Sequence, residues 1–167
     1  ILDERTAHGP YASLADFLSR VGSKNLNRKS LESLIKCGAL DSLGKRGTLL
    51  THIETLLAYH REATAEAPQD SLFGAVFSAP ALELPDGDDV SLSDKLIWEK
   101  ELLGIYVSGH PLDAHEKFLA KSRVTLGALA EDTQSGLPIA LPALVSDVRT
   151  ILTKSGEKMA FIRLEDK

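Results

Sequence analysis

Residues 27–41 read NRKSLESLIKCGALD and predict a helix that ends in a tight turn. Asn27 is a favourable residue for a helix start, and the leucines and isoleucine that follow repeat at the spacing that places side chains on one helical face. Gly38 comes next, and glycine is the residue that most readily reverses the backbone at a helix end. The stretch therefore predicts two helices packed across a short turn.

The sequence on both sides continues this helical pattern. Upstream, Ser13 can cap a helix that carries an apolar face and ends at Gly22. Downstream, apolar residues at the helical period predict one long helix from about Gly47 to about Ala65. The apolar share of 43% is large enough to supply a core for these helices.

Residues 66–91 differ from the rest of the chain in composition. Proline, glycine and aspartate are frequent there, which is typical of a flexible linker. Within this segment, residues 72–77 form a short apolar stretch, LFGAVF. An apolar stretch in a polar linker indicates either a docking peptide or a segment that packs back on the neighbouring domain.

The second half of the chain predicts further helices and then two strands. Ser93 and Asp94 can cap a helix, residues 109–111 (GHP) interrupt the chain, and a short helix follows. Residues 141–152 and 158–164 read as strands joined by a turn that contains a glycine. We therefore expect a mainly α fold, a helical bundle with a C-terminal β-hairpin.

Bulk composition excludes several classes of protein. The single cysteine, Cys37, precludes an internal disulfide framework and is typical of a reducing cytoplasm. No apolar run is long enough to span a bilayer, so we expect no membrane partner. The net charge of −5 is concentrated in the middle of the chain, whereas the first 62 residues are mildly basic, which permits contact with nucleic acid there.

No group of residues predicts catalysis or metal binding. His110, Asp113 and His115 lie close together in the sequence, but His110 stands in the chain break and no further ligands cluster nearby. Cys37 has no evident base to activate it as a nucleophile. We therefore predict no catalytic residue, no metal and no cofactor in this chain, and an independent hydrolase has no support.

Three stretches resemble bacterial DNA polymerase III alpha subunits, the C-family replicative polymerases. They are residues 9–17 with 26–29 and 34–41, residues 101–112 (ELLGIYVSGHPL), and residues 148–149 with 153–156 and 159–161. The resemblance covers essentially the whole chain. It implies that the catalytic palm, with the Mg²⁺ that such a polymerase uses, lies outside this chain.

The resemblance also implies a division into four parts. They are the C-terminal part of a helix-hairpin-helix domain (1–65), a flexible linker with a clamp-binding peptide (66–91), connector helices (92–136) and the first two strands of an OB domain (137–167).

The resemblance implies that the turn in residues 36–40 binds duplex DNA without reading its sequence. In a helix-hairpin-helix, backbone N–H groups point at a phosphate, and glycine allows the close approach. The residues implied are Gly38 and Ala39 in the turn, the flanking Lys36, Lys45 and Arg46, and the nearby Lys24, Arg28 and Lys29. The alternative is that Gly38 only ends a helix and that the lysines are solvated.

Residues 69–73 read QDSLF, which has the pattern Gln-x-x-Leu-Phe. The family carries a sliding-clamp motif between its hairpin domain and its OB domain, so the resemblance implies that Gln69, Ser71, Leu72 and Phe73 bind the clamp. Leu72 and Phe73 would enter an apolar pocket, and the Gln69 amide would hydrogen-bond its rim. The alternative is that the Leu-Phe pair folds back on the helices.

The two predicted strands would begin a barrel that binds single-stranded nucleic acid through basic and aromatic groups. Arg149, Lys154 and Lys158 are the candidate contacts. The alternation of side chains along a strand places Phe161 and Arg163 on one face. The alternative is that Phe161 belongs to the core of the barrel.

Together these features predict a non-catalytic segment of a chromosomal replicase, which binds duplex DNA and a sliding clamp and works with other replicase subunits in the cytoplasm. The parent would be a DNA-directed DNA polymerase, and this chain alone would be inactive. The alternative is a helix-hairpin-helix DNA-binding module of a repair or recombination protein. That alternative explains the hairpin but not the GHP interruption followed by two strands.

Overall fold

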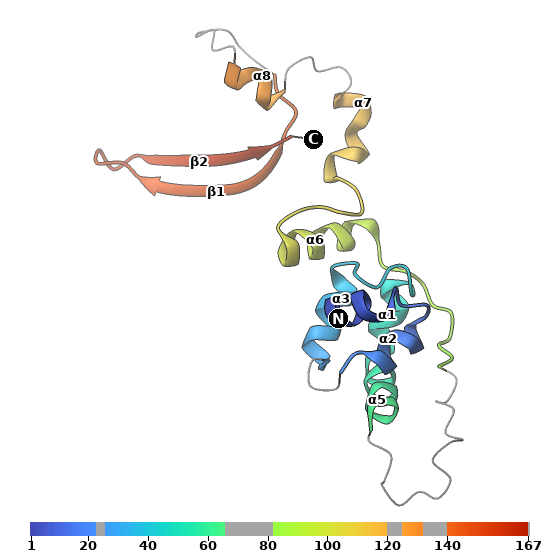
Figure 1. Cartoon of the computed structure of the whole chain (residues 1–167). Coiled ribbons are helices and arrows are strands. Elements are labelled where there is room, and N and C mark those ends of the chain that lie inside the picture. The colour runs from blue at the N-terminus through green and yellow to red at the C-terminus, as the bar shows by residue number, and fades with distance from the viewer. Residues whose placement is uncertain (23–25, 66–81, 120–124, 132–139, 167) are drawn as a thin grey trace, which may run out of the picture. The chain divides into compact units, whose positions relative to one another are not determined.

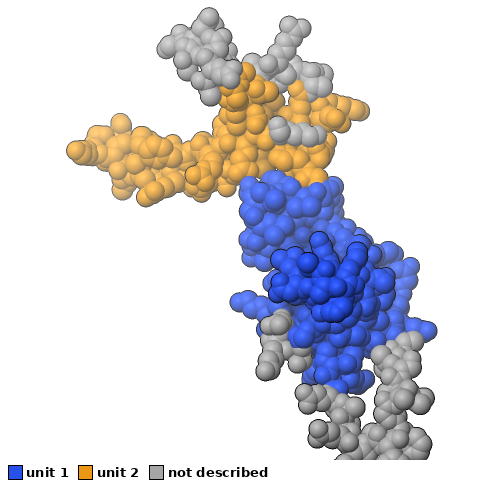
Figure 2. All heavy atoms as spheres, viewed as in Figure 1, with its two compact units in different colours: residues 1–108 blue, residues 109–167 orange. Residues whose placement is uncertain are grey.

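The computed structural model of the chain describes residues 1–22, 26–65, 82–119, 125–131 and 140–166. The chain divides into two compact units, residues 1–108 and residues 109–167 (Figure 2). The first unit is helical, and the second ends in a two-stranded sheet (Figure 1). The predicted fold class, mainly α with a C-terminal β-hairpin, is confirmed.

The helices of the first unit begin at residues that the sequence favours for capping. At the start of α2, Ser13 Oγ accepts a hydrogen bond from the N–H of Asp16. At the start of α3, Asn27 and Ser30 accept from each other's N–H groups in a reciprocal capping box. The helices are α1 (Leu2–His8), α2 (Leu14–Arg20), α3 (Arg28–Lys36), α4 (Arg46–Thr51), α5 (Ile53–Thr64) and α6 (Leu92–Leu103).

The core of the first unit lies among α2, α3 and α5. Leu18, Leu31 and Leu56 are completely buried in it. Phe17 meets Tyr11 edge to face, with 5.1 Å between the ring centroids. Burial of each large apolar side chain contributes about 1.5–3 kcal/mol, so the apolar faces predicted from periodicity account for why these helices associate.

Two predicted helix boundaries are wrong. The single helix expected from about Gly47 to about Ala65 is divided into α4 and α5 at His52, which has φ −103° and ψ 22°. Both helices bury apolar side chains in the same core, so the apolar spacing continues across the break and does not reveal it. The cap of α6 is Ser91 rather than Ser93, because Ser91 Oγ accepts from the N–H of Asp94.

Residues 82–90 have no regular secondary structure, in agreement with their linker-like composition. They nevertheless lie on the first unit, because Leu82 and Leu84 pack against its core. Composition predicts the lack of helix or strand but cannot show which surface an extended segment follows. The rest of the predicted linker, residues 66–81, lies outside the described residues.

The second unit contains the β-hairpin that the sequence predicts. Its strands are antiparallel, Thr150 lies opposite Ala160, and Gly156 completes the turn with φ 82°. None of the helices in the described part of the chain combines the length and the apolar character needed to cross a bilayer. The elements are the 3₁₀-helix η2 (Pro111–His115), α7 (Glu116–Leu119), α8 (Leu126–Glu131), β1 (Leu144–Leu152) and β2 (Lys158–Glu165).

Candidate nucleic-acid interface

The turn after α3 is a helix C-cap of the Schellman type. Gly38 has φ 82° and donates its N–H to the carbonyl of Ile35 at 3.1 Å, and Ala39 donates to the carbonyl of Leu34 at 3.0 Å. The N–H groups predicted to meet a phosphate are therefore already bonded within the turn. This geometry agrees with the alternative interpretation, in which the glycine ends a helix.

Arg46, a predicted DNA contact, is buried in the first unit, with 1% of its surface exposed. Its guanidinium donates to the carboxylates of Asp41 and Glu99 at 2.7–2.8 Å. It also donates to the carbonyl of Lys36 at 2.9 Å and to the hydroxyl of Ser108 at 3.0 Å. A guanidinium turned inward onto these partners does not face a DNA phosphate, so Arg46 stabilises the fold instead.

Glu99 is the fully buried partner of Arg46 and attaches α6 to the beginning of α4. Its carboxylate also accepts from the N–H groups of Val107 and Ser108 and from the Ser108 hydroxyl. Burial by itself raises the pKa of the Glu99 carboxyl, but the hydrogen bonds from Ser108, Val107 and Arg46 outweigh it and lower that pKa to about 2. Glu99 is therefore ionised at neutral pH.

Gly38 makes room for this ion pair. A Cβ atom at Gly38 would overlap the guanidinium of Arg46. The glycine thus meets two requirements, a positive φ at the helix end and the close approach of Arg46. The turn that was predicted to approach a phosphate approaches a buried guanidinium of its own chain.

Most of the other predicted cations of the first unit lie on its surface. Lys29 is exposed at the start of α3 and has no ion-pair partner among the described residues. Arg28 and Lys36 each pair with a glutamate, on α5 and on α3 respectively. Lys24 lies outside the described residues. Lys29 is therefore the predicted cation best placed, in the described part of α3, to meet an anionic partner.

Lys45 is held by residues 84–90, a segment that we call the strap. The Lys45 ammonium, with 51% of the side chain exposed, lies 2.8 Å from a carboxylate oxygen of Asp86 and donates to the carbonyl of Gly87 at 3.3 Å. The hydrogen bond to Asp86 is the main reason that the pKa of Lys45 is raised. Lys45 thus remains a cation, but it is already paired with a carboxylate of the same chain.

The predicted clamp-binding residues Gln69, Ser71, Leu72 and Phe73 lie outside the described residues. The segments on either side of them, the end of α5 and the residues from Leu82 onward, both belong to the first unit. The assignment of these four residues stays a prediction.

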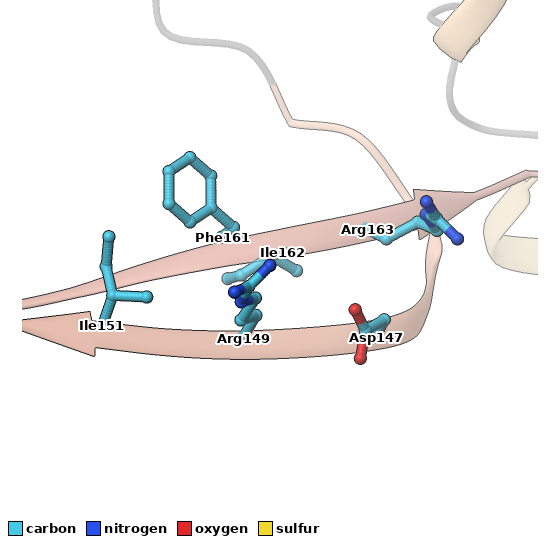
Figure 3. A pocket seen from close by; sticks show the side chains of 6 residues that line it. All are labelled: Asp147, Arg149, Ile151, Phe161, Ile162 and Arg163. Carbon is cyan, nitrogen blue, oxygen red and sulfur yellow. The ribbon is translucent and has the colours of Figure 1, made fainter.

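The hairpin carries basic and aromatic side chains on one face (Figure 3). The register places Arg149 opposite Phe161 and Asp147 opposite Arg163. Because side chains alternate along each strand, all four share a face, as predicted for Phe161 and Arg163. Phe161 is 57% exposed in this hairpin.

The other two cations predicted for the hairpin do not join this face. Lys154 lies in the turn between β1 and β2, and Lys158 is paired with Leu152 on the opposite face. The structure therefore brings Arg149 together with Arg163 and separates both from Lys158.

Sequence reasoning missed the two carboxylates that organise the first unit. Glu99 is 53 residues from Arg46 in the sequence, and Asp86 is 41 residues from Lys45. No local pattern marks a pair separated by such distances, so the sequence carried no signal for either. In the described part of the chain, no cluster of three or more histidine, cysteine or acidic side chains could hold a metal.

The beginning of the first unit matches a known motif. The profile of the helix-hairpin-helix motif matches residues 1–49, which comprise α1 to α3, the turn and the beginning of α4. This part of the chain therefore contains a helix-hairpin-helix motif.

Relatives identify the family more narrowly. The chain is 37% identical to the DNA polymerase III alpha subunit of Thermus aquaticus over 100% of its length, and 38% identical to that of Bacillus subtilis over 95%. It is 32% identical to the Pseudomonas aeruginosa subunit over 100% of its length. The chain belongs to the family of bacterial DNA polymerase III alpha subunits, and it spans only 14–16% of the length of these relatives.

Proposed function

We propose that this chain is a non-catalytic segment of a replicative DNA polymerase and that its first unit holds duplex DNA through lysine side chains. The observation that carries the proposal is the exposed Lys29, which has no ion-pair partner among the described residues and lies within the region that matches the helix-hairpin-helix motif. Lysine contacts to phosphates position a protein without reading sequence, which suits a polymerase that must hold any duplex. Arg46 and the N–H groups of Gly38 and Ala39 are not part of this contact.

The proposed DNA contact is tested by titrating the chain with a fluorescently labelled duplex at several salt concentrations. We expect weak binding that falls steeply with salt, because lysine contacts release counterions. The Lys29→Ala variant should lower the salt slope by about one, since one phosphate contact is lost.

Lys117→Ala is the matched control, because it removes the same charge from the exposed surface of the second unit. An unchanged slope in Lys29→Ala, or an equal change in both variants, would contradict the assignment of Lys29.

We further propose that Gln69, Ser71, Leu72 and Phe73 bind a sliding clamp. The Gln-x-x-Leu-Phe pattern in a chain of this family supports it. A peptide within a linker gains effective concentration from its tether, which is how a clamp keeps a polymerase on its template.

The clamp proposal is tested with the double variant Leu72→Ala, Phe73→Ala in a pull-down with a bacterial sliding clamp. Loss of these two apolar anchors should abolish retention and leave the helical circular dichroism unchanged. The pair Val76→Ala, Phe77→Ala removes similar side chains from the same segment and should still be retained. Equal retention of both double variants and the unmodified chain would refute the motif.

The hairpin supports a further part of the same function. We propose that it begins an OB domain and that Arg149, with Phe161 opposite it, contacts single-stranded DNA, with Lys154 and Lys158 in a secondary role. We also propose that Mg²⁺ belongs to the catalytic part of the polymerase, and that the whole acts in the cytoplasm with other replicase subunits. Similarity to the polymerase relatives favours this function over a repair or recombination module.

A further inference from the structure

The strap, residues 84–90, lies over the beginning of α4 and is fixed there at several points. Leu84 packs against the core of the first unit. Asp86 pairs with Lys45 at 2.8 Å. Asp89 pairs with Lys95 and also accepts from the N–H of Gly47 at 3.4 Å. The strap is therefore anchored by apolar packing as well as by charge.

Two glycines let the strap and α4 come close together. A Cβ atom at Gly47 would overlap the carbonyl oxygen of Asp88, and one at Gly87 would lie 3.1 Å from Thr48 Oγ1. The two backbones are about 40 residues apart in the sequence, and a side chain at Gly47 would force them to separate. The strap thus has a fitted position on α4, and that position brings Asp86 onto Lys45.

The strap carries negative charge, as the phosphate backbone of a nucleic acid does. The hydrogen bond from Lys45 lowers the pKa of the Asp86 carboxyl, so Asp86 is ionised at neutral pH. A carboxylate at 2.8 Å from an ammonium occupies the position in which a phosphate oxygen would bind. The pair is largely exposed, with 51% of the Lys45 side chain and 87% of the Asp86 side chain accessible, so it is weak and a phosphate can displace it.

We propose that the strap is an autoinhibitory segment, which competes with the phosphates of duplex DNA for Lys45. This inference rests on the proposed function of the first unit. With the strap seated, Lys45 contributes little to DNA binding. When DNA displaces Asp86, Lys45 becomes a phosphate contact in addition to Lys29.

The test measures duplex affinity by fluorescence anisotropy for two variants that open the strap in different ways. Gly47→Ala displaces the strap without changing the charge of the chain, and Asp86→Asn removes the competing carboxylate. Each should bind about two- to fivefold more tightly than the unmodified chain, because an exposed ion pair is weak and its loss frees a single cation for a phosphate. In each, a second change of Lys45→Ala should remove the gain.

Two matched controls accompany these variants. Gly127→Ala lies in the second unit and meets nothing closer than 3.9 Å, and Glu83→Gln removes an exposed charge next to the strap. Neither should alter affinity. If Gly47→Ala and Asp86→Asn bind like the unmodified chain, the autoinhibition is refuted while the DNA contact stands. If no form of the chain binds duplex DNA, the proposed function fails and the autoinhibition with it.

Discussion

At the scale of single residues, Arg46 and Glu99 hold opposite charges where water does not reach. Taking two charges out of water costs several kcal/mol each, and their attraction offsets this only when hydrogen bonds satisfy the remaining donors and acceptors. Here Asp41, Ser108 and the N–H of Val107 supply those bonds. Removal of either charge alone therefore leaves the other buried without its partner.

The lowered pKa of the Glu99 carboxyl predicts that the stability of the first unit depends on pH. Its pKa falls from an ordinary value of 4.5 to about 2 on folding, so its contribution is fully present above 4.5 and is lost as the pH falls toward 2. Glu99→Gln should lose about 3–5 kcal/mol of unfolding free energy at neutral pH and show a smaller further loss in acid. Urea unfolding monitored by circular dichroism at a series of pH values measures both effects.

The control for this experiment is Glu83→Gln, which alters an exposed carboxylate outside the buried network. It should keep the full acid-dependent loss of stability. An acid profile of Glu99→Gln that parallels that of the unmodified chain would show that another carboxylate causes the loss.

At the scale of the element, the end of α3 shows what sequence reasoning can and cannot reach. The cap at Asn27, the apolar face and the turn at Gly38 were all predicted, because each depends on residues within a few positions of one another. The break at His52 was not predicted, since apolar residues continue at helical spacing through it. The buried position of the Arg46 side chain also depends on Glu99, which is too distant in the sequence for a local pattern to include it.

The C-cap of α3 allows the two roles of Gly38 to be separated. Gly38→Ala should destabilise the first unit by more than about 1 kcal/mol, because alanine disfavours the positive φ and its Cβ would overlap Arg46. Gly104→Ala, at the end of α6, has a similar φ of 75° but meets nothing within 4 Å. The difference between their unfolding free energies in urea measures the cost of the overlap, and equal values would show that Arg46 moves aside freely.

At the scale of the whole molecule, the first compact unit comprises residues 1–108, so α6 belongs to the same unit as the helices that end before residue 66. The Arg46–Glu99 pair joins α4 to α6, although a segment of linker-like composition separates the two helices in the sequence. Composition identifies where regular structure stops, but it cannot identify which segments return to the same core. The family, the helical class and the hairpin were predictable, whereas this long-range connection required the structure.

The extent of the first unit can be tested by cutting the chain at two places. A piece ending at residue 108 should fold with a cooperative thermal transition, because it retains the core and the ion pair. A piece ending at residue 65 lacks Glu99 and Ser108 and should be less stable, since Arg46 loses two of the side chains that hold it in place. Similar melting temperatures for the two pieces would show that α6 contributes little.

The Arg46–Glu99 pair also has a consequence for evolution. Because losing one member costs far more than losing both, lineages that replace the arginine by an apolar residue should replace the glutamate as well. Intermediates carrying a single change would be rare, and the two positions would covary in descendants even as the stretch between them drifts freely in length and composition.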